Sequence, residues 1–105
     1  EVHRQIGEIY LLQGNYNQAL DEFNLALDKQ EDNAEVYKGV GKVYFEIEEP
    51  ESALEYFQKS LSLNNKDYDL YNYISDCYIE LERYPEAIRE LEIVKQANPD
   101  DTEVR

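Results

Sequence analysis

Apolar and small side chains recur along this chain with a period of 34 residues. Ala53, Leu54 and Phe57 have counterparts 34 positions earlier and 34 positions later. Those counterparts are Ala19, Leu20 and Phe23 on one side, and Ala87, Ile88 and Leu91 on the other. Two further sets keep the same period: Gly7, Gly41 and Ser75, and Tyr10, Tyr44 and Tyr78. Self-similarity at this spacing is typical of helical repeat arrays, so we predict three copies of one unit.

Within each copy, the apolar positions follow the i, i+3, i+4, i+7 spacing of amphipathic helices. We expect first helices over about 2–13, 34–47 and 69–81, and second helices over about 15–29, 50–63 and 85–97. Short polar residues suit the N-caps of these helices. They are Asn15, which forms a capping-box pattern with Gln18, and Asn33, Asp67 and Asp101. Pro50 falls in a first turn, where its missing N–H does no harm.

Small residues lie at matching places in the helices of each unit. They are Gly7, Ala19, Gly41, Ala53, Ser75 and Ala87. Glycine lowers the stability of a helix interior by roughly 1 kcal/mol, so close packing is the physical reason to keep it there. We therefore expect paired helices to approach closely at these positions, with Tyr and Phe rings filling the gaps between them.

The period also predicts the domain organisation. Residues 1–105 form one domain with repeats at about 1–33, 34–67 and 68–101, and residues 102–105 begin a truncated further helix. Asp101-Thr102-Glu103-Val104 resembles Asn33-Ala34-Glu35-Val36, and the chain contains no Met. We therefore expect this sequence to be part of a longer multi-repeat protein.

The charge balance is strongly acidic. The net charge is −14, divided as −5, −3 and −6 over the three repeats and 0 over the last four residues. Nucleic acids and anionic membranes both attract clustered Lys and Arg, so neither is an expected partner. No apolar run approaches the roughly 20 residues of a membrane span, and no signal peptide is present. The lone Cys77 is compatible with a reducing compartment, and we expect a cytoplasmic protein.

Candidate chemistry is sparse. His3 is the only histidine, so no histidine-based metal cluster or triad can form, and we expect it to take part in helix packing. Cys77 aligns with the apolar Ile9 and Val43, which predicts a buried structural thiol. The stretch 39–42, GVGK, lacks the spacing of a phosphate loop and falls inside a helix. We predict no catalytic, metal or cofactor residues, and not an enzyme.

These repeats resemble the tetratricopeptide repeat, and the resemblance covers nearly the whole chain. It rests on the small residue and Tyr of each first helix, the Ala and aromatic of each second helix, and Pro99 after the last. The departures are Ser75 for Gly, Leu91 for an aromatic, Val94 for a small residue, and Glu31 and Asn65 where Pro is usual. The resemblance implies an all-α solenoid of helix-turn-helix units, wound into a right-handed superhelix. Its concave groove, lined by the first helices, would bind peptides or partner helices without catalysis.

The outward positions of the first helices would line that groove. They are Arg4, Gln5, Glu8, Leu12, Glu35, Lys38, Lys42, Phe45, Asn72, Tyr73, Asp76 and Ile79. The predicted peptide-binding residues among them are Arg4, Glu8, Lys38, Lys42, Phe45, Asn72, Tyr73 and Asp76. Lys38 and Lys42 either pair with Glu35 and Glu46 on a solvated helix face, or bind a peptide carboxylate. Tyr73 and Phe45 are candidate aromatic anchors.

One branch of the resembled family grips the C-terminal carboxylate of heat-shock chaperones. The matching positions here hold Arg4, Glu8, Gly39, Asp69 and Tyr73. Only Arg4 suits that role, and a carboxylate facing Glu8 and Asp69 would be repelled. We therefore predict that this chain is not a carboxylate clamp.

Two functions follow from the sequence. The first is a non-catalytic scaffold that binds a protein or peptide in the groove, with basic residues on the partner matching the acidic surface. The alternative is a self-associating assembly segment of a larger protein. In that case Ile88, Leu91 and Val94 at the C-terminal edge form an apolar patch that supports a homo-oligomer. A mass that depends on concentration would distinguish the second function from the first.

Overall fold

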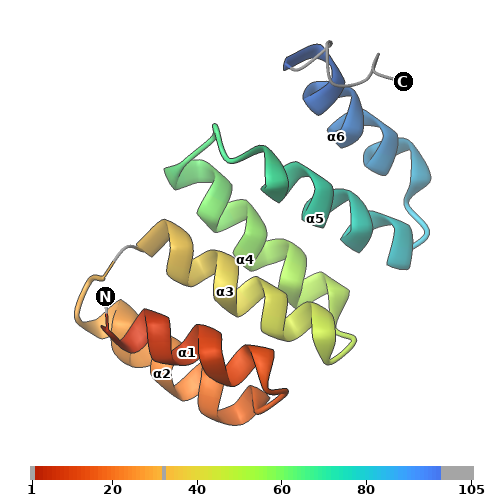
Figure 1. Cartoon of the computed structure of the whole chain (residues 1–105). Helices are drawn as coiled ribbons and strands as arrows, with labels where there is room; N and C mark the ends of the chain where they lie inside the picture. The colour runs from red at the N-terminus through yellow and green to blue at the C-terminus, as the bar shows by residue number, and fades with distance from the viewer. Residues whose placement is uncertain (1, 32, 98–105) are drawn as a thin grey trace.

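The computed structural model describes residues 2–31 and 33–97, and this part of the chain forms six α-helices without strands (Figure 1). The helices are α1 (Val2–Leu12), α2 (Tyr16–Asp28), α3 (Asn33–Glu46), α4 (Pro50–Leu63), α5 (Tyr68–Glu80) and α6 (Tyr84–Ala97). Their order and bounds confirm the helices predicted from the 34-residue period, to within one or two residues at each end. The segment from 98 to 105, with Pro99, Asp101 and the predicted further helix, lies outside the described residues.

The helices pack as three successive hairpins. α1 pairs with α2, α3 with α4 and α5 with α6, and each second helix also packs against the first helix of the following pair. Figure 1 shows the hairpins stacked along one direction, which gives an all-α solenoid measuring 39 × 25 × 24 Å. The expected α-solenoid is confirmed.

The small residues of the first helices lie where aromatic rings from the second helices meet them. A β-carbon on Gly7 would lie 2.8 Å from the ring of Phe23, and one on Gly41 would lie 2.7 Å from the ring of Phe57. The third unit departs from this arrangement, since buried Ser75 instead donates a hydrogen bond of 3.3 Å to the backbone oxygen of Ala87. Any larger residue at Gly7 or Gly41 would displace a ring, which confirms close packing as the reason for these glycines.

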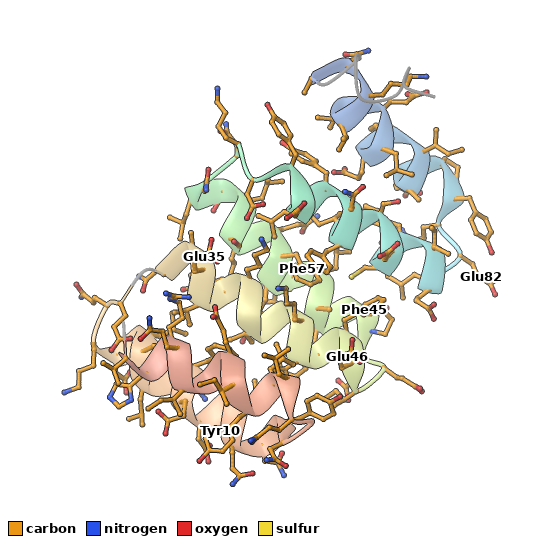
Figure 2. All side chains as sticks on the ribbon, viewed as in Figure 1. Tyr10, Glu35, Phe45, Glu46, Phe57 and Glu82 are labelled. Carbon is orange, nitrogen blue, oxygen red and sulfur yellow. The ribbon has the colours of Figure 1, made fainter. Side chains whose placement is uncertain are left out.

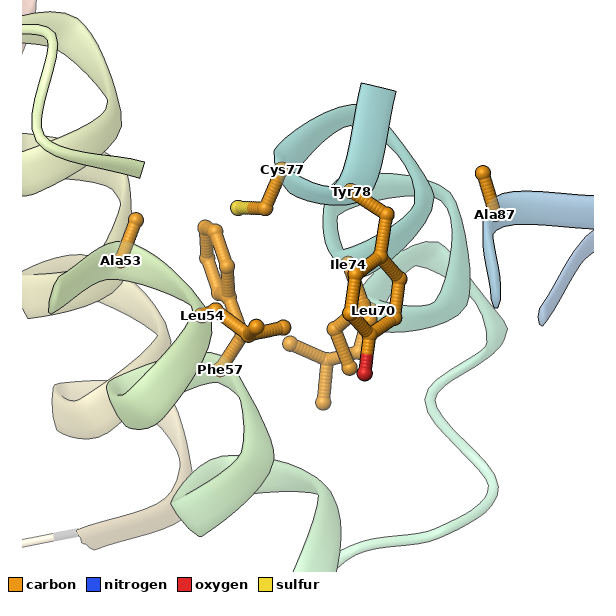
Figure 3. Close-up of a cluster of buried hydrophobic side chains, with 8 residues drawn as sticks. All are labelled: Ala53, Leu54, Phe57, Leu70, Ile74, Cys77, Tyr78 and Ala87. Atoms are coloured by element: carbon orange, nitrogen blue, oxygen red, sulfur yellow. The ribbon is translucent and has the colours of Figure 1, made fainter. Parts of the chain in front are cut away.

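The core consists of two clusters, one at each junction between hairpins. The first joins α2 to α3 through Ala19, Phe23, Ala26, Val36, Val40 and Val43. The second joins α4 to α5 and reaches Ala87 of α6 (Figure 3), through Ala53, Leu54, Phe57, Leu70, Ile74, Cys77 and Tyr78. Burial is therefore distributed along the array, as expected for stacked repeats.

Cys77 is a free thiol inside the second cluster, with no exposed surface. Burial, with smaller contributions from the charges of Asp76 and Glu80, raises the pKa of the thiol to about 12. The thiol therefore stays protonated near neutral pH and is a poor nucleophile. The prediction of a buried structural cysteine is confirmed.

The turn inside each hairpin contains a left-handed residue at the same repeat position. These residues are Gly14, Glu48 and Glu82, with φ of 80°, 67° and 60°. In each turn the following N–H donates to the carbonyl of the conserved-position tyrosine, as in Asn15 to Tyr10 at 2.9 Å and Arg83 to Tyr78 at 2.8 Å. Left-handed backbone favours glycine, so the second and third turns hold a residue that is strained there.

The predicted caps are wrong in their side-chain roles. Asn15 precedes α2 but makes no cap hydrogen bond, because its amide donates to Gln13 Oε1 at 3.0 Å. Asp67 precedes α5, yet its carboxylate binds Lys38 instead of the helix N-terminus. Asn33 is the first residue of α3, and its buried Oδ1 has no hydrogen-bond partner among the described residues. Pro50 begins α4 as expected.

Candidate functional site: the groove along the first helices

Two adjoining pockets lie along the first helices of the hairpins. The larger, about 460 Å³, is lined by Leu11, Leu12, Gln13, Gly14, Tyr16, Lys42, Phe45, Glu46 and Tyr73. The smaller, about 220 Å³, is lined by Glu8, Leu11, Leu12, Glu35, Lys38, Gly39 and Lys42. Because the two pockets share Leu11, Leu12 and Lys42, they form one depression across α1, α3 and α5, which we call the groove. Figure 2 shows Glu35 and the Phe45–Glu46 pair toward opposite ends of α3.

The groove has an apolar wall that the fold does not need. Leu12 is 87% exposed, and Leu11, Phe45 and Tyr73 are half-buried. Phe45 and Tyr73 pack at the edge of the second core cluster, and Leu11 at the edge of the first. These side chains therefore have fixed positions and still present apolar surface to a ligand, as interaction sites commonly do.

Tyr73 is held in the groove from two directions. Its ring stacks on the buried Phe57, with centroids 5.2 Å apart and planes inclined by 16°. The ammonium of Lys42 lies 5.3 Å from the Tyr73 centroid, and that of Lys38 lies 6.0 Å away. The aromatic face attracts both cations, so Tyr73 organises the basic part of the groove.

Lys38 has a different partner from the one expected. Its ammonium donates to Asp67 Oδ2 at 2.9 Å, and both side chains are less than one-fifth exposed. Burial alone would lower the pKa of Lys38, but the hydrogen bond and charge of Asp67 outweigh it and raise that pKa. The predicted pairing with Glu35 on the same helix is wrong. Lys38 ties α3 to the start of α5.

Lys42 also departs from its expected pairing. Within the described ranges 2–31 and 33–97, no carboxylate lies within ion-pairing distance of its ammonium, so the predicted bridge to Glu46 is absent. Its contact with the Tyr73 ring leaves hydrogen-bond donors available. Lys42 lines both pockets, and it is the groove cation best placed to meet a ligand.

The remaining candidate residues lie outside the two pockets or on one edge. Arg4 donates to Glu8 Oε2 at 2.8 Å, and its side chain is 15% exposed. Glu8 lines the smaller pocket. Asn72 and Asp76 are exposed on α5 and line neither pocket. The structure thus brings Glu8, Lys38, Lys42, Phe45 and Tyr73 together and leaves Arg4, Asn72 and Asp76 apart; a ligand role for any of them remains a prediction.

Sequence reasoning missed two lining residues. Leu11 lines both pockets, and Tyr16 at the start of α2 lines the larger one. Leu11 was detectable, since it lies 34 positions before Phe45 and so takes the same place in its repeat. Tyr16 belongs to a second helix, which the family resemblance does not place in the groove.

The groove continues past Phe45 into an acidic hollow. A pocket of about 570 Å³ there is lined by Phe45, Glu46, Glu48, Pro50 and Glu80. Its carboxylates extend the acidic character of the chain to one end of the groove. Opposite charge on a partner would speed its encounter with this surface.

Two further observations concern other kinds of site. Among the described residues, no group of three or more His, Cys, Asp or Glu is arranged to hold a metal ion. In the same part of the chain, no helix has the length and apolar character needed to cross a membrane. His3 packs against α2, where its Nδ1 lies 2.9 Å from Glu22 Oε1.

The stacked hairpins and the groove define a helical-repeat protein of the interaction-module class. The tetratricopeptide repeat family matches residues 1–66, and a second profile of the same family matches residues 44–105. The chain belongs to the tetratricopeptide repeat family, whose members are generally non-catalytic modules for protein interaction. A comparison with curated protein sequences gives no match.

Solved structures share the fold at low sequence identity. The first TPR of Spaghetti (RPAP3) bound to the HSP90 peptide SRMEEVD has a TM-score of 0.86 and 22% identity, covering 94% of this chain and 79% of that one. The first TPR domain of human RPAP3 gives 0.84 and 22%, covering 94% and 78%. MamA gives 0.85 and 18%, covering 98% of this chain and 56% of its own. At these identities the likeness establishes the fold alone.

Proposed function

We propose that the groove binds an extended or helical segment of a partner protein. The observation that carries this proposal is the continuous pair of pockets lined by Leu11, Leu12, Phe45 and Tyr73. Leu12 is the most exposed large apolar residue of the described chain, and it faces a wall of fixed aromatic rings. An apolar side chain of the partner would fill the larger pocket, since aromatic-lined pockets supply much of the binding energy at interfaces.

The partner we propose carries basic residues. The groove and its continuation contain Glu8, Glu35, Glu46, Glu48 and Glu80, in a chain whose net charge is −14. Arg4 and Lys38 are already neutralised by Glu8 and Asp67. Lys42 is left to donate to a backbone carbonyl of the ligand or to a single acidic side chain. Electrostatic complementarity would mainly raise the association rate and exclude acidic competitors.

A C-terminal carboxylate is a poor ligand for this groove. The RPAP3 domain binds an HSP90 peptide, SRMEEVD. Here, the matching positions place Glu8 against Arg4, and the space beyond Gly39 is filled by the ring of Phe23. Tyr73 is engaged with Phe57. We expect no measurable binding of SRMEEVD, because its acidic end would meet carboxylates in place of paired cations.

The test is selection from a displayed random-peptide library, followed by affinity measurement for the selected peptides and for SRMEEVD. The groove variant is Leu12→Ser with Lys42→Gln, which changes two lining residues and neither core cluster. We expect the wild type to select peptides with an apolar residue near Lys or Arg. The variant should bind them at least about tenfold more weakly, the loss typical of a contact at the centre of an interface.

A matched control separates groove contacts from general surface changes. Leu63→Ser with Lys29→Gln removes an exposed Leu and an exposed Lys that lie far from both pockets. This control should bind the selected peptides like the wild type. Equal affinity of the groove variant and the wild type would refute the proposal, as would selection of peptides with acidic C-termini.

A further inference from the structure

The outer face of α1 carries an apolar triad that is exposed. Val2, Ile6 and Ile9 are 61%, 37% and 55% exposed. Their counterparts 34 residues later are Val36, Val40 and Val43, and 34 residues beyond those come Leu70, Ile74 and Cys77; all six are at most 3% exposed. At both internal junctions this triad is covered by the second helix of the preceding hairpin. The α1 triad is thus a docking face whose partner helix is missing from the fold.

The surface that covers the triad at each internal junction also has an uncovered copy. In the second junction, Leu54 and Phe57 of α4 face Leu70, Ile74 and Cys77 of α5 (Figure 3). The residues 34 positions after Leu54 and Phe57 are Ile88 and Leu91 of α6, which are 57% and 42% exposed. The expected apolar edge is therefore present at Ile88 and Leu91, whereas Val94 is half-buried. One molecule carries both halves of its own internal junction, at opposite ends.

We propose that this chain associates head to tail, with α6 of one copy packing against α1 of a second copy. The contact would repeat the internal junctions, with Ile88 and Leu91 of the first copy set against Val2, Ile6 and Ile9 of the second. The two faces differ, so the contact is heterologous, and each added copy leaves one free face at either end. Chains of copies would then grow without a fixed size. None of these five residues lines the groove, so the assembly is independent of the function proposed above.

Charge opposes this assembly and makes it sensitive to salt. Each copy carries a net charge of −14, and mutual repulsion is screened within about 10 Å at 0.1 M ionic strength. Added NaCl should therefore strengthen the association. A contact held by salt bridges would weaken instead.

The test uses mass measurement by sedimentation at increasing protein concentration, with three neutral double variants. The head variant is Val2→Gln with Ile9→Gln, and the tail variant is Ile88→Gln with Leu91→Gln. The control is Leu63→Gln with Leu25→Gln, whose side chains are 57% and 42% exposed, the same as those of the tail variant, and belong to neither face. Circular dichroism checks that each variant is folded. All substituted side chains are substantially exposed, so folding should persist.

We expect the wild type and the control to grow beyond dimers as concentration rises, and each end variant alone to remain monomeric. Mixing the two end variants should give one-to-one dimers and nothing larger, because one intact head meets one intact tail. A head variant that still dimerises alone would mean a tail-to-tail contact and would overturn the proposal. A wild type that stays monomeric up to about 1 mM, the range of weak binding, at low and high salt would overturn it as well.

Discussion

The two junctions between hairpins are built on the same repeat position but with opposite choices of residue size. At the first junction, a β-carbon on Gly39 would lie 2.5 Å from the ring of Phe23, so the ring occupies the space of a side chain. At the second junction, the counterpart of Gly39 is Tyr73, which stacks on Phe57. α1 and α3 approach each other more closely than α3 and α5 do. A single small-to-large difference therefore accompanies a change in how neighbouring repeats sit together.

The same difference also shapes the groove. Gly39 leaves no side chain of its own in the smaller pocket, whereas Tyr73 forms an aromatic wall of the larger one and attracts Lys42. Packing and recognition are therefore coupled at this position. A residue chosen to fit the ring beneath it also decides what a ligand meets above.

The largest effect should come from removing the ring that the first junction is built around. Phe23 has no exposed surface and contacts the positions of both Gly7 and Gly39. We expect Phe23→Ala to lower the free energy of unfolding by about 3–5 kcal/mol, the usual range for a buried Phe. Urea unfolding followed by circular dichroism measures the change.

The Gly39→Ala substitution sharpens this prediction, because its sign should depend on Phe23. In the wild type the added methyl collides with the ring, and overpacking of about 1–3 kcal/mol exceeds the gain of about 1 kcal/mol from helix propensity. In the Phe23→Ala background the space is open, so Gly39→Ala should stabilise. If it destabilises both backgrounds equally, Phe23 is not the reason for the glycine.

A smaller effect is expected from the ion pair that only the second junction contains. Lys38 and Asp67 tie α3 to α5, while their counterparts at the first junction are Arg4 and the neutral Asn33. Asp67→Asn should destabilise the protein by about 1–3 kcal/mol, since it leaves a mostly buried ammonium with a weaker acceptor. The rate at which a thiol reagent labels Cys77, which lies at this junction, should rise in parallel.

The pH dependence of the pair has a definite sign. The pKa of Lys38 is raised above its usual value of 10.5 in the folded protein. Its contribution to stability is therefore fully present below the unfolded pKa, and it is lost as pH rises through the higher folded pKa. The difference in unfolding free energy between the wild type and Asp67→Asn should shrink from about pH 8 to above about pH 11. A constant difference would mean that Lys38 does not carry the interaction.

The sequence predicted the elements better than the contacts between them. The 34-residue period identified each helix and the paired small and aromatic residues, because those follow from spacing along one chain. The partner of Lys38 lies 29 residues away, while the i, i+3 and i, i+4 rules consider only neighbours on one helix. Asn15 and Asp67 were suitable caps by type, yet other donors took their side chains. Competition between partners depends on tertiary structure, which the period does not encode.

The smallest effect should come from a turn that belongs to neither junction. Glu48 adopts φ of 67°, where Gly14 stands in the first repeat. A left-handed residue other than glycine is strained by about 1–2 kcal/mol, and the greater freedom of glycine in the unfolded chain offsets part of the gain. Glu48→Gly should therefore raise the free energy of unfolding by about 0.5–1 kcal/mol in urea titrations.

This turn provides the internal reference for the junction comparison. Because Glu48 touches neither Phe23 nor the Lys38–Asp67 pair, the effect of Glu48→Gly should add to those of Phe23→Ala and Asp67→Asn within about 0.5 kcal/mol. Glu55→Gly, an exposed change in the middle of α4 where the backbone is helical, should instead destabilise by up to about 1 kcal/mol. If Glu48→Gly also destabilised, the left-handed turn would not be a source of strain, and the gain would have to be sought at the junctions themselves.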